Sequence, residues 1–465
     1  MVDVKYDKRI LARVVLEAET PLSIGSGAKT VLTDSPILKD VNGFPYIPGS
    51  SIAGVIRHSL GEDKAKLLFG FKGDRNDADS DVTNGSRIII SEARLVGLDG
   101  KVLDGILDLD TLDKNFTSRF ARLPKRNHVR LSDKGTAEDK GKFDEEVIYK
   151  GARFAFEIEL VMSAEDDPES FDEILAELRK ETFRIGAGSR SGLGKVKVVS
   201  LLRREFDLRN AEELDRYLEC SSSLCSDHSG WKEMTNCSID ATGWIKYDLT
   251  LTPEDFFLFG AGFGDEDVDE KSVTESYICW NAESGRGEFR DNALLIPAAS
   301  LKGSLSHRVA FYCNIKDEVF AMETDAAEFK NHCGGKNEAV RVLFGCQDGD
   351  SEDSQKRGMC LFSDIIGEYK TGEKVLNHVS IDRFTGGAID GALFSEKAVD
   401  GKGRHLEFKT SILVKKPSEM SDGFAKALAC LELALGDIDR GTLPLGGGSG
   451  RGHGIFKCEW TKKEL

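Results

Sequence analysis

"IPGSSIAGVIR" runs from Ile47 to Arg57, and "IPAASLKGSLS" runs from Ile296 to Ser306. Each stretch brings an apolar run to a proline and continues with apolar residues at helical spacing. The proline is expected to end a strand, and Ser51 and Ser300 are expected to cap the helices that follow. Because one chain holds two strand-to-helix junctions of the same kind, the sequence predicts two copies of a domain.

Further segments of the first half have partners in the second half, in the same order. The matched segments are 16–27 with 249–262, 67–70 with 342–345, 86–95 with 358–367, 127–160 with 377–413, 171–183 with 424–436, and 184–198 with 443–457. The pattern in each half indicates a strand, a helix, a strand, a long polar hairpin, a strand, a helix, a glycine-rich loop and a final strand. This order predicts an α+β fold of two tandem ferredoxin-like domains, the sheet that RNA-recognition domains share.

The predicted domain boundaries follow from the one segment that has no partner. The first domain is expected over residues 1–199 and the second over 244–465, with 200–243 as a connector. A protruding β-hairpin is expected in each domain, within 127–150 and within 377–405.

The two glycine-rich loops, "GAGSRSGLG" and "GGGSGRGHG", are each followed by a strand-like segment. A nucleotide-cofactor loop would precede a helix, so that function is not predicted. Glycine permits close approach of the backbone to a ligand. Arg190 and Arg451 lie among these glycines, so both are expected to contact a polyanion, with a tight turn as the alternative explanation.

The net charge of −17 argues against nucleic-acid binding, because most of the surface would repel phosphate groups. The charge is uneven, however, because residues 117–131 hold five cations and no acid. A local basic groove therefore stays possible, beside the plainer interpretation of a solvated face.

The N-terminal residues lack the features of a secretion signal, and no apolar run has the length of a membrane span. A cytoplasmic protein without membrane contact is expected. The ten cysteines are expected as free thiols in that compartment.

Taken together, these motifs resemble the CRISPR-associated RAMP superfamily. "TDSPILKDVNGFPYIPGSS" (33–51) and "HVSIDRFTGGAIDGALFSEKAV" (378–399) look like segments of the backbone subunits of type III effector complexes. Two such domains in one chain are similar to the fused form in type III-D variant complexes. The resemblance implies sheets that bind guide RNA, thumb hairpins that enter the guide–target duplex, and cleavage of target RNA at regular six-nucleotide intervals. The implied partners are guide RNA, single-stranded target RNA and other effector subunits.

The resemblance maps the family's cleavage aspartate onto Asp34, in "LTDSP". A carboxylate beside a splayed phosphodiester can hold Mg²⁺ or Mn²⁺, or help to deprotonate a ribose 2′-OH. The alternative is an Asx turn before Pro36. In the second half, alignment by eye places Glu275 opposite Asp34, whereas counting from the glycine turn points to Asp269. Both candidates stay open.

RNA contacts are expected from polar and cationic residues in the matched motifs. These residues are Ser50, Ser51, Arg57, His128, Arg130, Arg190, Ser300, Lys302, Arg308, His378, Arg383, Arg451 and His453. The lysine that is frequent in this motif of the family is Ala53 in the first half and Lys302 in the second, so the contacts are expected to be unequal.

The connector offers a possible zinc site. Cys220, Cys225, His228 and Cys237 supply four ligand-type side chains, although without the close cysteine pairing of typical zinc motifs. Free cysteines are the alternative.

The function that these features favour is a metal-dependent, target-cleaving backbone subunit that binds guide RNA. A non-catalytic structural subunit and a guide-processing endoribonuclease of the same superfamily are the alternatives within RNA biology. An acidic α+β protein with an unrelated small ligand is the alternative outside it.

Overall fold

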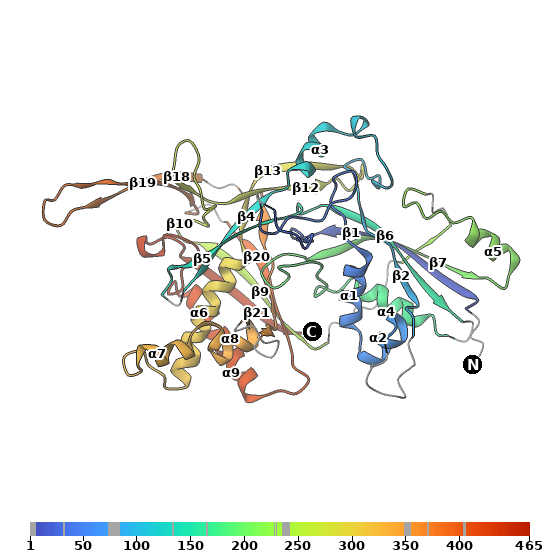
Figure 1. The fold of residues 1–465 in the computed structure, drawn as a ribbon. Coiled ribbons are helices and arrows are strands. Elements are labelled where there is room, and N and C mark those ends of the chain that lie inside the picture. Colours follow the sequence, from blue (N-terminus) through green and yellow to red (C-terminus); the bar gives the residue numbers. More distant parts are fainter. Residues whose placement is uncertain are drawn as a thin grey trace.

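A computed structural model describes residues 6–30, 33–72, 84–132, 134–163, 166–226, 228, 230–234, 242–347, 355–369, 372–402 and 406–465. Helices and antiparallel sheets share the chain, so the predicted α+β class is confirmed. The two halves of the chain lie side by side, with α1, α2 and α4 below the first sheet and α6 to α9 at the lower side of the second in the view of Figure 1, whereas α3 lies above the first sheet.

The sheet of the first half is built around β1, and β1 pairs antiparallel with β6 and with β7. The strand order is β2-β6-β1-β7-β8. The elements are β1 (Lys8–Ala18), α1 (Gly49–Ser59), α2 (Glu62–Phe69), β2 (Ile88–Ile90), β3 (Arg94–Leu95), α3 (Lys114–Ala121), β4 (Lys125–Leu131), β5 (Ala137–Glu146), β6 (Arg153–Met162), α4 (Glu169–Glu177), β7 (Val196–Asp207), α5 (Ala211–Leu218) and β8 (Lys232–Glu233). Alternate residues of β1, Ile10 to Leu16, pack with Ile52 of α1 and Ile174 of α4, as a half-buried strand requires.

The sheet of the second half has β9 at its centre and the strand order β16-β20-β9-β21. The elements are β9 (Trp244–Pro253), β10 (Phe256–Phe257), β11 (Glu270–Lys271), β12 (Thr274–Trp280), β13 (Gly287–Ile296), α6 (Ala298–Lys316), α7 (Ala326–Phe329), α8 (Glu338–Leu343), β14 (Gly345–Gln347), β15 (Gln355–Arg357), β16 (Cys360–Leu361), β17 (Ile365–Gly367), β18 (Gly372–Ile381), β19 (Ala388–Asp400), β20 (Phe408–Lys415), α9 (Asp422–Asp439) and β21 (Phe456–Glu464). Both sheets therefore place the first, second, third and last core strands in the same spatial order.

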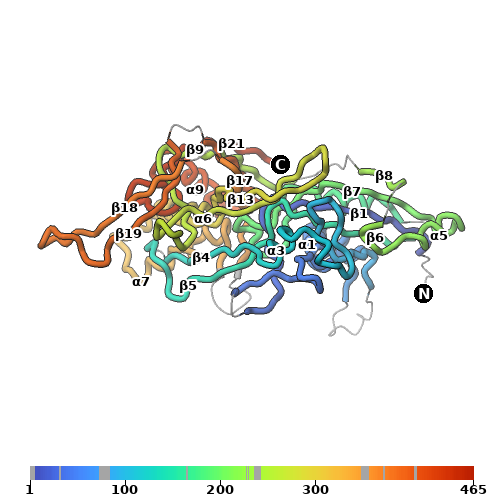
Figure 2. Tube along the Cα trace, turned by 90° about the horizontal axis from the view of Figure 1, so that it is seen from above, coloured from blue at the N-terminus to red at the C-terminus, as the bar shows by residue number. Residues whose placement is uncertain are grey.

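Each half also holds a long hairpin that covers most of the expected segment and begins before it, at Lys125 and at Gly372. β4 pairs with β5, and β18 pairs with β19. Figures 1 and 2 show β18–β19 projecting far beyond the second sheet. The strands of both hairpins are mostly exposed; β5 is correspondingly rich in charged residues, whereas β18 exposes Val375, Val379 and Ile381.

The connector is partly integrated into the first sheet. β7 continues through residue 199 as far as Asp207, and β8 pairs with it. The segment that follows α5 packs on the sheet face away from the helices, where the buried Arg13 donates to the carbonyl oxygens of Ser223 and Leu224. Across the described residues, every helix is too short or too polar to cross a lipid bilayer.

The expected serine caps are wrong. Helices α1 and α6 begin directly after Pro48 and Pro297, and neither has a side-chain cap. The amide N–H groups of Ser51 and Ser300 donate to the carbonyl oxygens of those prolines, so both serines lie in the first turn. Pro48 and Pro297 hold the N-cap position with extended ψ values of 137° and 127°, and the first turn forms on their carbonyl oxygens, which is why the helices begin earlier than expected.

An arm from the second half crosses to the first half. It consists of β12, β13 and β17, and Figure 1 shows β12 and β13 running above the first sheet. The indole N–H of Trp280 donates to the carbonyl oxygen of Gly151 at 2.7 Å, and the Arg119 guanidinium pairs with Asp291 at 2.7 Å. Phe289 packs against Tyr149, with ring centroids 5.2 Å apart.

A buried ionic contact also joins the halves. Arg126 of β4 lies between Glu275 of β12 and Asp364, and these side chains are 7%, 7% and 0% exposed. The guanidinium contacts both oxygens of Glu275 and approaches Asp364 to 2.5 Å. Burial alone would lower the pKa of Arg126, but Asp364 and Glu275 outweigh burial and raise it, so the side chain stays charged.

We expect Arg126→Leu to lower the free energy of unfolding by about 3–5 kcal/mol, because it leaves two buried carboxylates without a cation. Urea titration followed by circular dichroism measures this change. The triple variant Arg126→Leu, Glu275→Leu, Asp364→Asn should recover most of the loss, since it removes the orphaned charges and keeps a cap for Ala298. Equal stability of the single variant and the wild type would contradict the assignment.

Candidate nucleic-acid interface

Asp34 lies in an exposed loop that docks on the return strand of the first hairpin. Its backbone N–H donates to the Asp144 carboxylate at 2.8 Å, and its own carboxylate accepts from the Asp144 N–H at 3.3 Å. Asp269 repeats this arrangement on the second hairpin, because its carboxylate accepts from the Ser395 N–H at 2.8 Å and from the Ser395 hydroxyl at 3.1 Å. Each half therefore presents one exposed aspartate at the same place on its hairpin.

Backbone pairing supports the same match. Ser35 bridges to Glu145 in parallel, just as Glu270 bridges to Glu396. Upstream, Gly25 bridges to Ile37 and Gly260 to Ser272, so the two loops keep one register. Asp269 is therefore the structural counterpart of Asp34, and the counterpart of Glu275 is Asp40. Glu275 is held by the buried Arg126 and is not exposed beside a hairpin.

The two histidines of the "NHV" motifs also occupy matching places. His128 stacks on Phe143 with ring centroids 4.9 Å apart, and His378 stacks on Phe394 at 4.7 Å. In each case the imidazole Nε2 lies near the glutamate two residues after that phenylalanine, 2.9 Å from Glu145 and 3.0 Å from Glu396. This histidine–phenylalanine–glutamate set borders the exposed aspartate of each half.

The second glycine-rich loop is tied to its own hairpin. Arg451 pairs with the fully buried Glu396 and lies over the Phe394 ring. His453 is buried and faces the same glutamate at 3.5 Å. These contacts hold the loop against the hairpin, and they leave His453 little exposed surface.

The first glycine-rich loop instead reaches the second half. Arg190 donates to the carbonyl oxygen of Gly358, and a Cβ on Gly192 would lie within 2.2 Å of the Asp364 carboxylate. Gly192 also has a φ of +115°, so this close approach requires glycine.

Five basic side chains converge where this loop meets the second half, and we call them the seam cluster. They are His58 of α1, Arg190, Lys302 of α6, Arg357 of β15 and Lys415 of β20. Burial, followed by Arg357, lowers the pKa of Arg190 to about 10. Burial also lowers the pKa of Lys302, as does Arg190. Among the described residues, none of the five pairs with a carboxylate, so the seam cluster is an uncompensated basic site.

Other predicted contacts lie elsewhere. Arg308 is engaged with Asp437 and the carbonyl oxygen of Thr442, whereas Arg130 pairs loosely with Glu138 on the hairpin. The remaining predicted residues are Arg57, Ser50, Ser51 and Ser300 in the first turns or on the exposed face of α1 and α6, and Arg383 at the tip of the second hairpin.

Sequence reasoning missed several residues of the site. Arg357 and Lys415 lie far apart in the chain and carry no motif, so no local signal identifies them as members of the seam cluster. Asp144 and Ser395 could have been found, because "FDEE" and "FSEK" stand at matching places after the two "NHV" motifs.

The described members of the possible zinc site do not converge. The Cys220 thiol lies near the carbonyl oxygen of Arg216 and the Cys225 thiol near that of Val102, while His228 stacks on Trp231. Cys237 lies outside the described residues. In the described part of the chain, no three His, Cys, Asp or Glu side chains come together as a metal site, and the nine cysteines there are free thiols.

Comparison with known proteins matches residues 15–197 and 288–457 to the RAMP superfamily. These are the two halves that share strand order, hairpin and docked aspartate. The chain is also similar to the CRISPR system Cms endoribonuclease Csm3 of Methanocaldococcus jannaschii, with 26% identity over 214 residues, 41% of this chain and 78% of the relative. Because the family match covers most of both halves, this chain belongs to the RAMP superfamily.

Proposed function

We propose that this chain is an RNA-binding backbone subunit of a type III CRISPR effector complex and that it cleaves target RNA paired to the guide. The observation that carries the proposal is the duplicated site, in which an exposed aspartate is docked on a projecting hairpin in each half. The similarity to a relative named as a CRISPR endoribonuclease supports it. Cuts at regular six-nucleotide intervals, action in the cytoplasm and assembly with other effector subunits belong to the same proposal.

Each half is proposed to be a ferredoxin-like domain whose hairpin acts as a thumb. The strand orders β2-β6-β1-β7 and β16-β20-β9-β21 support this assignment. Neighbouring strands in both orders are antiparallel, and the helices lie between the strands that this topology requires.

Guide RNA is proposed to cross from one half to the other over the seam cluster. Phosphate groups would relieve the mutual repulsion of Arg190, Lys302 and Arg357, which share one site without a carboxylate. The acidic remainder of the surface would repel the backbone elsewhere, so the seam cluster would define its path.

Asp34 and Asp269 are proposed to be the catalytic carboxylates. Each is held by hydrogen bonds to a hairpin strand, yet stays exposed, so it can reach an RNA backbone that the hairpin splays apart. In that position a carboxylate can assist deprotonation of a ribose 2′-OH that is in line with its leaving oxygen. Pro36 restricts Ser35 to extended geometry, which helps to fix Asp34.

The donor set partly fits Mg²⁺ or Mn²⁺. Asp34 and Asp144 would hold such an ion in the first half and Asp269 in the second, with waters and RNA phosphates as further ligands. A bound divalent cation would stabilise negative charge on the phosphate oxygens.

We expect Asp34→Ala to slow one cut by about 10²–10⁴-fold and Asp269→Ala to slow a different cut by a similar factor. Guide and target affinity should be unchanged, because a carboxylate adds nothing favourable to polyanion binding. The measurement is gel mapping of target RNA cut by the reconstituted complex with Mg²⁺, with EDTA as the metal-removal arm.

Asp267→Ala is the matched control, since Asp267 is exposed in the same loop two residues from Asp269. If every cut survives both catalytic substitutions, the chain is a structural subunit and its proposed cleavage role is wrong.

We expect Lys302→Met to weaken guide binding and to reduce the slope of log K against log salt by about 0.7 to 1, the contribution of one phosphate contact. Methionine keeps the apolar stem of this partly buried side chain. Fluorescence anisotropy at several salt concentrations gives the slope. Lys330→Met, at an exposed lysine outside the seam cluster, should change neither value. An unchanged slope for Lys302→Met would remove the seam cluster from the RNA path.

A further inference from the structure

The two halves contact each other through different faces. The first half contributes β4 and its glycine-rich loop, and the second contributes β12 and the segment around Asp364. A head-to-tail contact between two copies of a repeat leaves the equivalent face open at each end. The first half must therefore carry an open counterpart of the face on which the second half receives Arg126.

Backbone register locates that counterpart. Asp40 corresponds to Glu275, as the docked loops show. Ile47 bridges to Ala93 as Ile296 pairs with Ile365, so Glu92 corresponds to Asp364. Both acids that hold Arg126 in the second half therefore have acidic equivalents in the first half.

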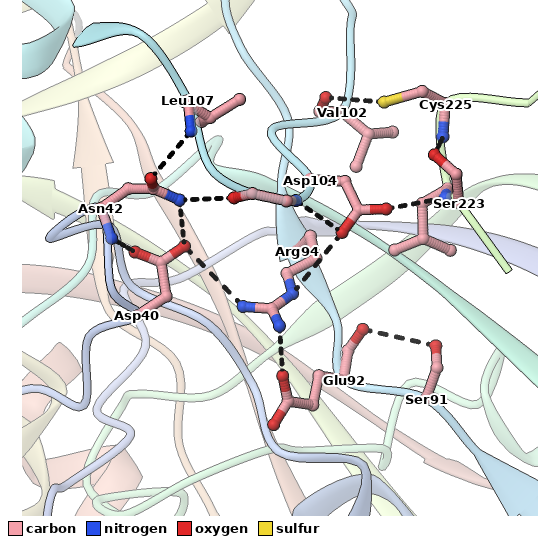
Figure 3. Close-up of polar contacts among 12 residues, drawn as sticks. Asp40, Asn42, Ser91, Glu92, Arg94, Val102, Asp104, Leu107, Ser223 and Cys225 are labelled. Atoms are coloured by element: carbon pink, nitrogen blue, oxygen red, sulfur yellow. Dashed lines mark hydrogen bonds and ion pairs between the residues drawn. The ribbon is translucent and has the colours of Figure 1, made fainter.

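Figure 3 shows how these acids are arranged. Arg94, which replaces Ile366, lies 2.5 Å from Glu92, 3.7 Å from Asp40 and 4.0 Å from Asp104. The three carboxylates and the one guanidinium of this site sum to a net charge of −2. Glu275 and Asp364 also carry a charge of −2 when Arg126 is not counted. Glu92 is half-exposed, with 48% of its side chain accessible. The side chain of Asp40 is only 6% exposed and accepts from the N–H groups of Asn42 and Phe44, and Asp104 accepts from the Leu224 N–H. Glu92 is therefore the carboxylate that an incoming cation can reach.

Apolar side chains flank the acids. Val41 is 84% exposed and Ile106 is 91% exposed. Asn42 ties their two loops together, because its side chain donates to the carbonyl oxygen of Gly105 at 2.9 Å and accepts from the Leu107 N–H at 3.1 Å. Exposed aliphatic groups beside an acidic centre suit a protein with a cation, whereas RNA phosphates would be repelled.

A second copy of this chain does not supply that cation. By register, Arg126 is replaced by Leu376 in the second half, because each stands two residues before the stacked histidine. The hydrogen bonds of Ile185 to Gly194 and of Leu445 to Gly454 place Arg190 opposite Gly450. The outer face of the second half thus lacks the arginines that the first half uses.

We propose that the face formed by Glu92, Val41 and Ile106, above the buried side chain of Asp40 and beside Asp104, is the docking surface for a different protein subunit, which places a lysine or arginine against Glu92. The partner is identified as an effector subunit only through the proposed function. The acidic face and its apolar flanks are independent of the RNA-cleaving site.

The test uses the assembled complex, purified with guide RNA, in which Ile106 is replaced by the photo-crosslinker p-benzoylphenylalanine. We expect one cross-link to another protein subunit, at a peptide that contains lysine or arginine. A cross-link to a second copy of this chain, a cross-link to RNA, or no cross-link to another chain would overturn the proposal.

Charge reversal then tests the role of the acids. In the cross-linker background, Glu92→Lys should lower the yield at least about tenfold, and Glu92→Gln should have a smaller effect. Glu288→Lys, at an exposed strand glutamate of the arm, should leave the yield unchanged. A yield unaffected by Glu92→Lys would overturn the ionic assignment. Guide content and target cleavage, measured in the same samples, test the proposed function separately.

Discussion

One guanidinium joins the two halves of this molecule. Arg126 lies in the first strand of the first hairpin and is buried between Glu275 of the arm and Asp364. The other carboxylate oxygen of Asp364 accepts from the N–H of Ala298 at the start of α6. A buried charge is tolerated only when it is paired and hydrogen-bonded, so this contact permits one arrangement of hairpin, arm and helix. The seam cluster and the spacing of the two docked aspartates both depend on that arrangement.

Duplication preserved the local geometry of each hairpin while the faces between the halves diverged. The histidine–phenylalanine–glutamate set and the docked aspartate recur because each is held within one half. Arg126 and Arg190 have no counterparts in the second half, where Leu376 and Gly450 stand. A contact between halves needs a given cation only once, so the second copy of that position was free to change. The two ends of the molecule consequently present different chemistry.

Much of the fold could be predicted from local pattern. The matched segments predicted two halves of like order, and both hairpins contain the "NHV" motifs as expected, although β4 and β18 begin before residues 127 and 377. The helix starts were wrong because proline, not serine, holds the N-cap position before each first turn. The choice between Glu275 and Asp269 stayed open because the second loop is longer. The pairing of Glu270 with Glu396 and the bridge of Gly260 to Ser272 fix its register, and Glu396 lies far from the loop in the chain.

The sequence by itself determined the duplication, the α+β class, the family resemblance and Asp34 as a candidate, because each depends on residues close together in the chain or on their repetition. The tertiary structure decided which acids are exposed and which are buried. Asp269 and Glu275 are both acids of one loop region, yet one is docked on a hairpin in water and the other is sealed against Arg126. The seam cluster likewise exists only after folding, since its five cations come from distant segments and their shared electrostatics depends on distance in space.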